Sequence, residues 1–167
     1  MNDKKPGMRY YKLIAENRKA RFDYIISEVY KAGLVLTGSE VKSLRQGSLN
    51  LRDSYARVER EELWLYNAHI SPYSTADKNK FDPLRRRKLL LNKRELLKLV
   101  GKAAEKGLTL IPLKVYFEGN WAKADVGLAK AKKKFEKRDT LRRKSAQREI
   151  EDAFKGKSHD RRQRREQ

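Results

Sequence analysis

Four consecutive basic residues, Arg85 to Lys88, stand directly before three leucines, Leu89 to Leu91. Guanidinium and ammonium groups bind phosphates, and a fully solvated basic loop has no use for adjacent leucines. We therefore expect the leucines to anchor this segment and the four cations to lie where a polyanion can reach them. Pro83 disfavours a helical conformation at Asp82, which predicts an extended or turn entry. The alternative is an ordinary charged loop before a helix, and the pattern alone fits both equally.

The groups that could perform catalysis lack partners. The sequence contains no phosphate-binding glycine loop followed by Lys-Ser/Thr, no serine in a glycine elbow and no helical pair of histidines. It has no cysteine and only two histidines, His69 and His159, which leaves zinc almost without ligands. Glu40 and Asp82 are interpreted as ion-pair or turn residues rather than general acids. We expect no enzyme activity, no metal and no cofactor.

The large positive charge indicates a polyanionic partner. The 167 residues include 42 Lys and Arg against 22 Asp and Glu, a formal net charge of +20. Self-repulsion of this size suits a protein that works against a polyanion, and nucleic acid is the first candidate. Tyrosines such as Tyr10 and Tyr11 could stack on bases, although aromatic residues at strand spacing are more often core residues. No apolar run is long enough to span a bilayer and none resembles a signal peptide, so we expect a cytoplasmic protein without a membrane partner.

Hydrophobic periodicity predicts several strands. Residues 25–36 are rich in β-branched and aromatic side chains and predict a long strand or a bent pair of strands, with a kink at Gly33. Alternation predicts one antiparallel hairpin over 54–70 and another over 109–129. In the second hairpin Pro112 lacks an N–H group and predicts an edge or a bulge. One side of its first strand is expected to carry Ile111, Leu113, Val115 and Phe117.

Two helices are predicted between these strands. The first covers 38–47, and the second covers 93–106 with an apolar face and a glycine at the C-terminal cap position. Asn92 and Glu95 match a capping box at the start of the second helix.

These elements predict a mainly β fold with short helices, a small, partly open Greek-key barrel of the oligonucleotide-binding type. We expect the barrel over residues 17–129, preceded by a flexible basic arm at 1–16. Residues 130–167 are expected to form a basic tail that is disordered alone and becomes helical on a polyanionic surface. Periodicity does not distinguish the barrel from an open sheet.

Eight segments, in order, resemble one family of proteins. They are NRKARFDY (17–24), AGL (32–34), GSEVKSLR (38–45), HISPY (69–73), DPLRRRKLLLN (82–92), GLTLIPL (107–113), GLAKAKK (127–133) and EKR (136–138). The chain resembles small protein B, the partner of transfer-messenger RNA in bacterial trans-translation. The resemblance implies a barrel that binds the tRNA-like domain of this RNA and a tail that enters the mRNA channel and decoding centre of a stalled ribosome. Translation then resumes on a tagging frame.

The resemblance also implies functional residues, in segments that flank the predicted strands and a helix start. RNA contacts are expected from Asn17, Arg18, Lys19, Arg21, Lys42, Arg45, Leu90, Asn92 and Lys123. Ribosome contacts are expected from Lys130, Lys132, Lys133, Phe135, Glu136, Lys137, Arg138, Ile150 and Phe154.

The chain departs from the family pattern at three positions. Lys31 stands where members often have an acidic residue, which puts an acidic contact there in doubt. Ala131 replaces a glycine and Glu136 replaces an aspartate, and both are mild changes.

Two other functions are compatible with the composition. A structural ribosomal protein whose basic tail neutralises ribosomal RNA is the main alternative, and an RNA-modifying enzyme is disfavoured by the missing catalytic groups. We expect a monomer.

Overall fold

The structure, a computed structural model, describes residues 10–73, 81–103, 107–133, 135, 136, 138, 142 and 145. The chain forms two compact units, Met1–Ala131 and Lys132–Gln167. The first unit contains every strand found among the described residues.

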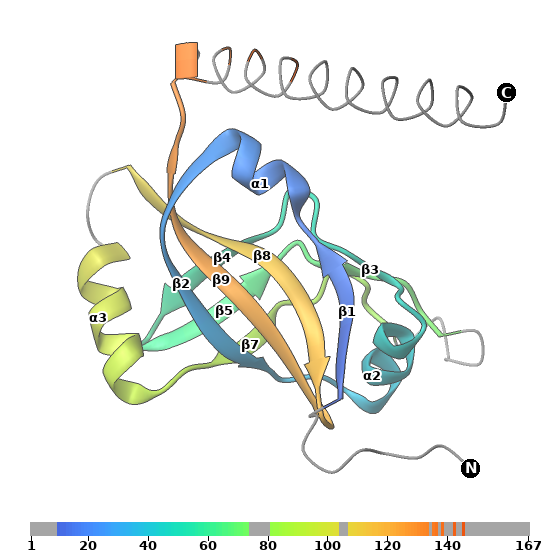
Figure 1. Ribbon diagram of the computed structural model, residues 1–167. Coiled ribbons are helices and arrows are strands. Elements are labelled where there is room, and N and C mark those ends of the chain that lie inside the picture. The colour runs from blue at the N-terminus through green and yellow to red at the C-terminus, as the bar shows by residue number, and fades with distance from the viewer. Residues whose placement is uncertain are drawn as a thin grey trace, which may run out of the picture. The chain divides into compact units, whose positions relative to one another are not determined.

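The first unit is a strongly bent antiparallel sheet with short helices (Figure 1). Its strands are β1 (Tyr11–Glu16), β2 (Tyr24–Leu34), β3 (Leu49–Asn50), β4 (Tyr55–Glu59), β5 (Glu62–Tyr66), β6 (His69–Ile70), β7 (Arg87–Leu90), β8 (Leu108–Glu118) and β9 (Trp121–Ala131). Its helices are α1 (Arg18–Asp23), α2 (Gly38–Arg45) and α3 (Lys93–Ala103). β3 and β6 pair separately as a two-stranded sheet.

The main sheet closes on itself. Its strand order is β1-β8-β4-β5-β7-β2-β9, and β8 also pairs with β9, which completes a ring of six strands with β1 added outside β8. The β4–β8 seam consists of a single residue pair, Ala56 and Leu110. This architecture confirms the predicted mainly β fold and partly open barrel of the oligonucleotide-binding type.

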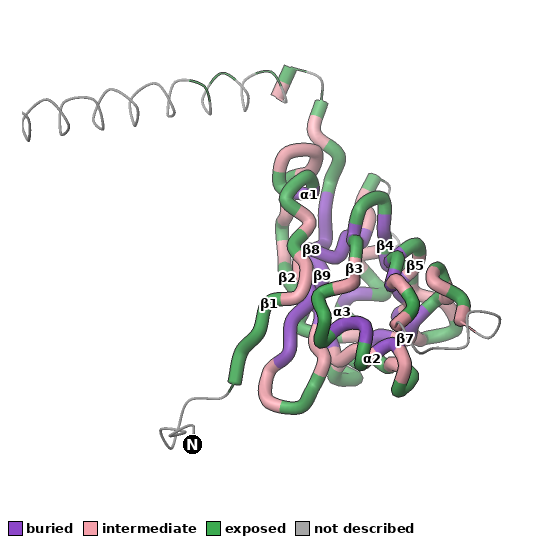
Figure 2. The backbone as a smooth tube through the Cα atoms, turned by 90° about the vertical axis from the view of Figure 1, so that its right-hand side faces the viewer, coloured by how far each residue is buried: buried purple, intermediate pink, exposed green. Residues whose placement is uncertain are grey.

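The core lies inside this ring, with a smaller apolar cluster outside it. Leu63, Leu65 and Val126 are among the side chains buried in the interior. Figure 2 shows buried residues through β8 and β9, and mainly exposed or intermediate residues in α1 and β1. Outside the ring, Ala20 of α1 packs with Ile111 of β8, so α1 covers part of the outer surface.

A bulge in β8 changes which side chains enter the interior. The register shifts between Pro112 and Lys114, so the predicted bulge is present. Before the bulge, Ile111 and Leu113 belong to the outer cluster, whereas Val115 beyond it lies in the interior core. The expectation that Ile111, Leu113, Val115 and Phe117 all lie on one side is therefore wrong: Val115 and Phe117 share the interior, whereas the extra residue puts Ile111 and Leu113 outside.

The folded region extends beyond the predicted barrel at both ends. Residues 11–16, expected in the flexible arm, form β1 because they pair with β8 and the ring of Tyr11 lies 5.0 Å from that of Tyr116. β9 continues to Ala131, so Lys130 lies in a strand rather than in the tail. These pairings join residues far apart in the sequence, and local periodicity does not reveal them.

Candidate nucleic-acid interface

The exposed outer surface of the sheet beside α1 is the candidate interface. Directly opposed residues of antiparallel strands place their side chains on the same face, which arranges this surface in three rows. The rows are Tyr11, Glu118 and Trp121; Leu13, Tyr116, Lys123, Gly33 and Leu90; and Lys114, Asp125 and Lys31. We call these residues the β8–β9 face.

A hydrogen-bonded network fixes the centre of this face. Asp125 accepts a hydrogen bond from the Tyr116 hydroxyl at 3.0 Å and lies 3.3 Å from the Lys114 ammonium group. Burial raises the pKa of Tyr116, and the hydrogen bond to Asp125 raises it further. Burial lowers the pKa of Lys114, but the Asp125 contacts outweigh it and the net pKa is raised, so Lys114 stays charged. Asp125 thus joins Tyr116 to a charged lysine at the centre of the face.

Two predicted RNA-binding residues meet on this face. Gly33 of β2 is paired with Leu90 of β7 on one side and with Lys123 of β9 on the other. Leu90 is exposed, and Lys123 forms an ion pair with Glu118. Because Gly33 has no side chain, no side chain separates Leu90 from Lys123 in this row.

Asn92 follows this row and begins α3. Its side-chain oxygen accepts a hydrogen bond from the Arg94 N–H at 3.1 Å, and its carbonyl accepts one from Leu96 at 2.9 Å. Asn92 is therefore an N-cap residue, as predicted, with an exposed side chain.

Four more of the predicted RNA-binding residues lie on or next to α1. Asn17 caps this helix, since its Oδ1 accepts a hydrogen bond from the Ala20 N–H at 3.1 Å. Ala20 is buried against the outside of β8, which turns Arg18, Lys19 and Arg21 toward the exposed side of the helix. Asn17 itself is half-buried, and its backbone N–H donates to the Leu113 carbonyl at 2.7 Å. Its clearest role is to hold α1 in place.

The last two predicted RNA-binding residues, Lys42 and Arg45, lie on α2. Thr37 and Glu40 form a complete capping box at the start of this helix. Lys42 and Arg45 are exposed, and the Lys42 ammonium group lies 5.8 Å from the centre of the Tyr73 ring. The Arg45 carbonyl accepts a hydrogen bond from Lys12 of β1 at 2.6 Å, which ties α2 to the edge of the sheet.

A buried ion pair between Glu40 of α2 and Arg87 of β7 holds α2 in place. The sequence did not predict this pair. Arg87 is 0% exposed, and its Nε lies 2.8 Å from Oε1 of Glu40. The Arg87 guanidinium also donates to the carbonyls of Ala68 at 2.6 Å and Pro83 at 3.1 Å. Arg85 contacts the other Glu40 oxygen at 2.5 Å.

This environment sets the charge of Glu40. Burial raises the pKa of its carboxyl, but hydrogen bonds from Arg85, from the Thr37 backbone and from Arg87 outweigh burial, and the net pKa is lowered. Burial lowers the pKa of Arg87, and the charge of Glu40 opposes that shift. The pair is thus fully ionised inside the protein.

The four basic residues Arg85 to Lys88 form ion pairs within the protein. Besides Arg85 and Arg87, Arg86 contacts Glu59 at 3.2 Å and Lys88 pairs with Glu62. The expectation that all four cations face a polyanion is wrong, because Arg87 is buried against Glu40, while Arg85, Arg86 and Lys88 stay partly exposed beside their carboxylate partners. The partners lie 26 to 47 residues away in the sequence, so inspection of the run itself could not find them.

The exposed groups surround the β8–β9 face. α1 lies at the end where Tyr24 of β2 pairs with Ala131, whereas Lys123 pairs with Gly33 at the other end. Nine residues of β2 separate these ends, roughly 30 Å of extended chain. α2 lies beyond β1 (Figure 1). The structure therefore brings Leu90, Lys123 and Lys31 together and places α1 and α2 at the borders.

The predicted tail residues belong to the second unit, except Lys130. Phe135, Glu136 and Arg138 are helical, and the Glu136 carboxylate accepts a hydrogen bond from the Lys133 N–H at 2.7 Å. Phe135 is exposed. Lys132 is half-buried, and Lys137, Ile150 and Phe154 lie outside the described residues.

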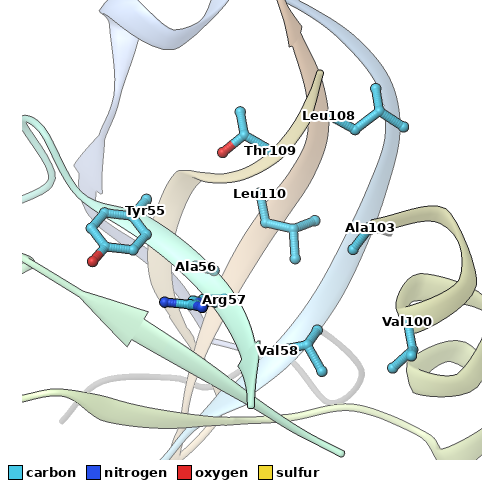
Figure 3. A pocket seen from close by; sticks show the side chains of 9 residues that line it. All are labelled: Tyr55, Ala56, Arg57, Val58, Val100, Ala103, Leu108, Thr109 and Leu110. Atoms are coloured by element: carbon cyan, nitrogen blue, oxygen red, sulfur yellow. The ribbon is translucent and has the colours of Figure 1, made fainter. Parts of the chain in front are cut away.

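A cavity of about 420 Å³ lies between β4, β8 and α3 (Figure 3). Val58 and Val100 face each other across it, and Leu110 forms its floor. Arg57 is the one charged residue among the described lining residues, so the cavity contains no acid–base pair for catalysis.

The described part of the chain holds neither a metal-binding cluster nor a membrane-spanning helix. No cluster of three or more His, Cys, Asp or Glu that could hold a metal was found there. None of the helices described has the length and apolar character needed to cross a membrane.

A partly open barrel with lysines and exposed aromatic rings on one outer face defines an RNA-binding protein of the oligonucleotide-binding type. The SmpB protein family model matches residues 14–156. The chain belongs to the SmpB family.

Similar proteins support this assignment. The chain is 57% identical over 87% of its length to the SsrA-binding protein of Carboxydothermus hydrogenoformans, covering 98% of that protein. It is 56% identical to the SsrA-binding protein of Geobacillus thermodenitrificans, over 86% of this chain and 93% of that one. A solved structure described as "tmRNA-SmpB: a journey to the center of the bacterial ribosome" is 51% identical with a TM-score of 0.62, over 74% of this chain and 86% of that one.

Proposed function

We propose that this protein binds the tRNA-like domain of transfer-messenger RNA and delivers it to stalled ribosomes for trans-translation. The observation that carries the proposal is identity above 50% to SsrA-binding proteins and to the SmpB of the tmRNA structure, over most of the chain. The protein acts by binding and has no catalytic step of its own. Its work on ribosomes places it in the cytoplasm.

The β8–β9 face and its borders supply the RNA contacts. Lys123 and Lys31 provide charge for phosphates, and Arg18 and Lys42 extend it onto α1 and α2. Lys31 stands opposite Asp125, so the position that is often acidic in the family adds a cation to this face. Leu90 offers an apolar contact to a sugar or base beside them.

Salt-dependent binding tests the proposal. The purified protein should retain the tRNA-like domain more tightly than a duplex DNA of equal length at physiological salt, because shape and 2′-hydroxyl contacts select RNA. Its affinity should fall steeply as salt rises, since lysine and arginine contacts release counterions. Equal affinity for both nucleic acids would instead support a non-specific basic protein.

A further inference from the structure

Exposed aromatic rings gather at the tip of the β8–β9 hairpin. Trp121 is 74% exposed, Tyr10 is 61% exposed and Tyr11 is 53% exposed. Tyr11 and Trp121 lie in one row of the β8–β9 face, on either side of Glu118. An exposed tryptophan leaves a large apolar surface in water, which is unfavourable unless a ligand covers it.

Tyr11 and Trp121 are the first residues of β1 and β9. Trp121 begins β9 and is paired with Glu118, and the turn between them is fastened by a hydrogen bond from the Gly119 N–H to the Tyr10 carbonyl at 2.7 Å. Tyr11 packs against Tyr116, which the Asp125 hydrogen bond holds. A ligand that stacks here would order little of the protein, and pre-organisation of this kind strengthens binding.

The charges beside the rings favour an anionic ligand. Lys123 lies in the next row and Lys31 in the row after it. Glu118, the carboxylate between Tyr11 and Trp121, is paired with Lys123. A nucleotide combines the two features that this place offers, because its base has an aromatic face and its phosphate is an anion.

We propose that Trp121 is a stacking residue for an unpaired base of the bound RNA, with Tyr11 beside it and the adjoining phosphate at Lys123. The proposal rests on the proposed function and extends it, because it assigns a single-stranded nucleotide to the hairpin tip beside the structured part of the RNA. Base stacking on an aromatic side chain corresponds to an affinity change of about 5- to 150-fold.

Substitution measures the contribution of the ring. Trp121→Ala should weaken binding of the tRNA-like RNA domain by about 5- to 150-fold, and Trp121→Phe should restore part of it. Leu97→Ala is the matched control, since Leu97 is a large apolar residue on α3 with 58% exposure outside the face.

Trp121→Ala should leave the dependence of affinity on salt unchanged, whereas Lys123→Ala should reduce the slope of that dependence by about one. A lower salt slope in Trp121→Ala would show that the ring acts only by placing Lys123.

Fluorescence provides a second measurement that does not depend on the alanine variant. The chain has two tryptophans, so Trp64→Phe leaves Trp121 as the single reporter in an otherwise intact protein. RNA should quench its emission if a base stacks on the ring. Unchanged emission, or wild-type affinity in Trp121→Ala, overturns the inference and leaves the proposed function standing; that result would fit a ring that contacts a protein. Failure of the wild-type protein to bind this RNA overturns both.

Discussion

Glu40 of α2 and Arg87 of β7 form an ion pair inside the protein, 47 residues apart in the sequence and 2.8 Å apart in space. The pair joins the helix that carries Lys42 and Arg45 to the strand that carries Leu90. One buried contact therefore links the α2 border of the candidate interface to the strand that places Leu90 on the β8–β9 face.

Arg87→Met should destabilise the fold by about 3–5 kcal/mol, because the Ala68 and Pro83 carbonyls lose the Arg87 donor and Oε1 of Glu40 keeps only its longer bond from Arg85. Denaturant unfolding measures this change. Arg57→Met is the control, since its side chain is 70% exposed and its substitution should change stability by only about 0.5 kcal/mol. Similar losses in both variants would show that burial of the pair is unimportant.

The same pair predicts a pH dependence. The pKa of Glu40 in the folded state lies below its ordinary value of 4.5. Its contribution to stability is therefore present above pH 4.5 and is lost as the pH falls through the folded-state pKa. The difference in unfolding free energy between wild type and Glu40→Gln should shrink below pH 4.5, by at most about 1.4 kcal/mol per pH unit. A difference that stays constant down to pH 3 contradicts this assignment.

Two substitutions of Asn92 distinguish its role as a helix cap from a role in RNA binding. Asn92→Asp keeps an N-cap oxygen but adds a negative charge beside Leu90, so we expect near-normal thermal unfolding and weaker RNA binding. Asn92→Ala is the matched variant, and loss of its cap should lower stability by about 1 kcal/mol. If the aspartate variant melts early and binds RNA normally at low temperature, capping alone explains this residue.

Truncation tests whether the barrel alone binds RNA and the tail is needed only for peptide tagging. Removal of 132–167 leaves β9 complete, because the strand ends at Ala131. We expect RNA affinity within a few fold of wild type and no peptide tagging on stalled ribosomes. Tagging yield and RNA affinity should be measured together. Parallel loss of both would place RNA contacts in the tail, and tagging that survives would remove the tail's proposed role.

Gly127 provides a packing test at the outer cluster beneath α1. A Cβ atom there would lie 3.0 Å from Ile26 Cγ2 and 3.2 Å from Leu113 Cδ1. Gly127→Ala should destabilise the barrel by about 1–3 kcal/mol, because the packed side chains of Ile26 and Leu113 must shift to admit the new methyl group. In Gly101→Ala, where no atom lies within 4 Å of the new Cβ, the substitution should raise stability by about 0.5–1 kcal/mol. Thermal unfolding of both variants should shift in opposite directions.

Much of the fold could be predicted from local patterns. The alternation of 109–129 indicated the β8–β9 hairpin, and Pro112 indicated the bulge, because the first is a period-2 signal and the second a missing N–H group. β1 and α1 were missed because six-residue elements carry weak periodicity. Their stability comes from contacts with β8, roughly a hundred residues away from β1.

The candidate site could be predicted less completely. The resemblance selected Leu90 and Lys123, which the structure places on one face, yet these residues remain predictions until RNA binding is measured. Charge counting misjudged Arg87, because a sequence shows how many cations it has and not which carboxylates fold onto them. Trp121 had a visible signal, an aromatic residue directly after a Gly-Asn turn, but only the exposed fraction of its side chain separates a stacking ring from a core ring.

The pairing of β1 with β8 and of β2 with β9 bears on the synthesis of the protein. The first two strands leave the ribosome roughly a hundred residues before their partners, a delay of about 5–20 s at ordinary elongation rates. During this interval the edge of β2 that pairs with β9 is open, and Tyr30 and Ala32, which are buried in the finished barrel, are still uncovered. Nascent chains of this protein should therefore depend on chaperones and be prone to aggregation until the last strand emerges.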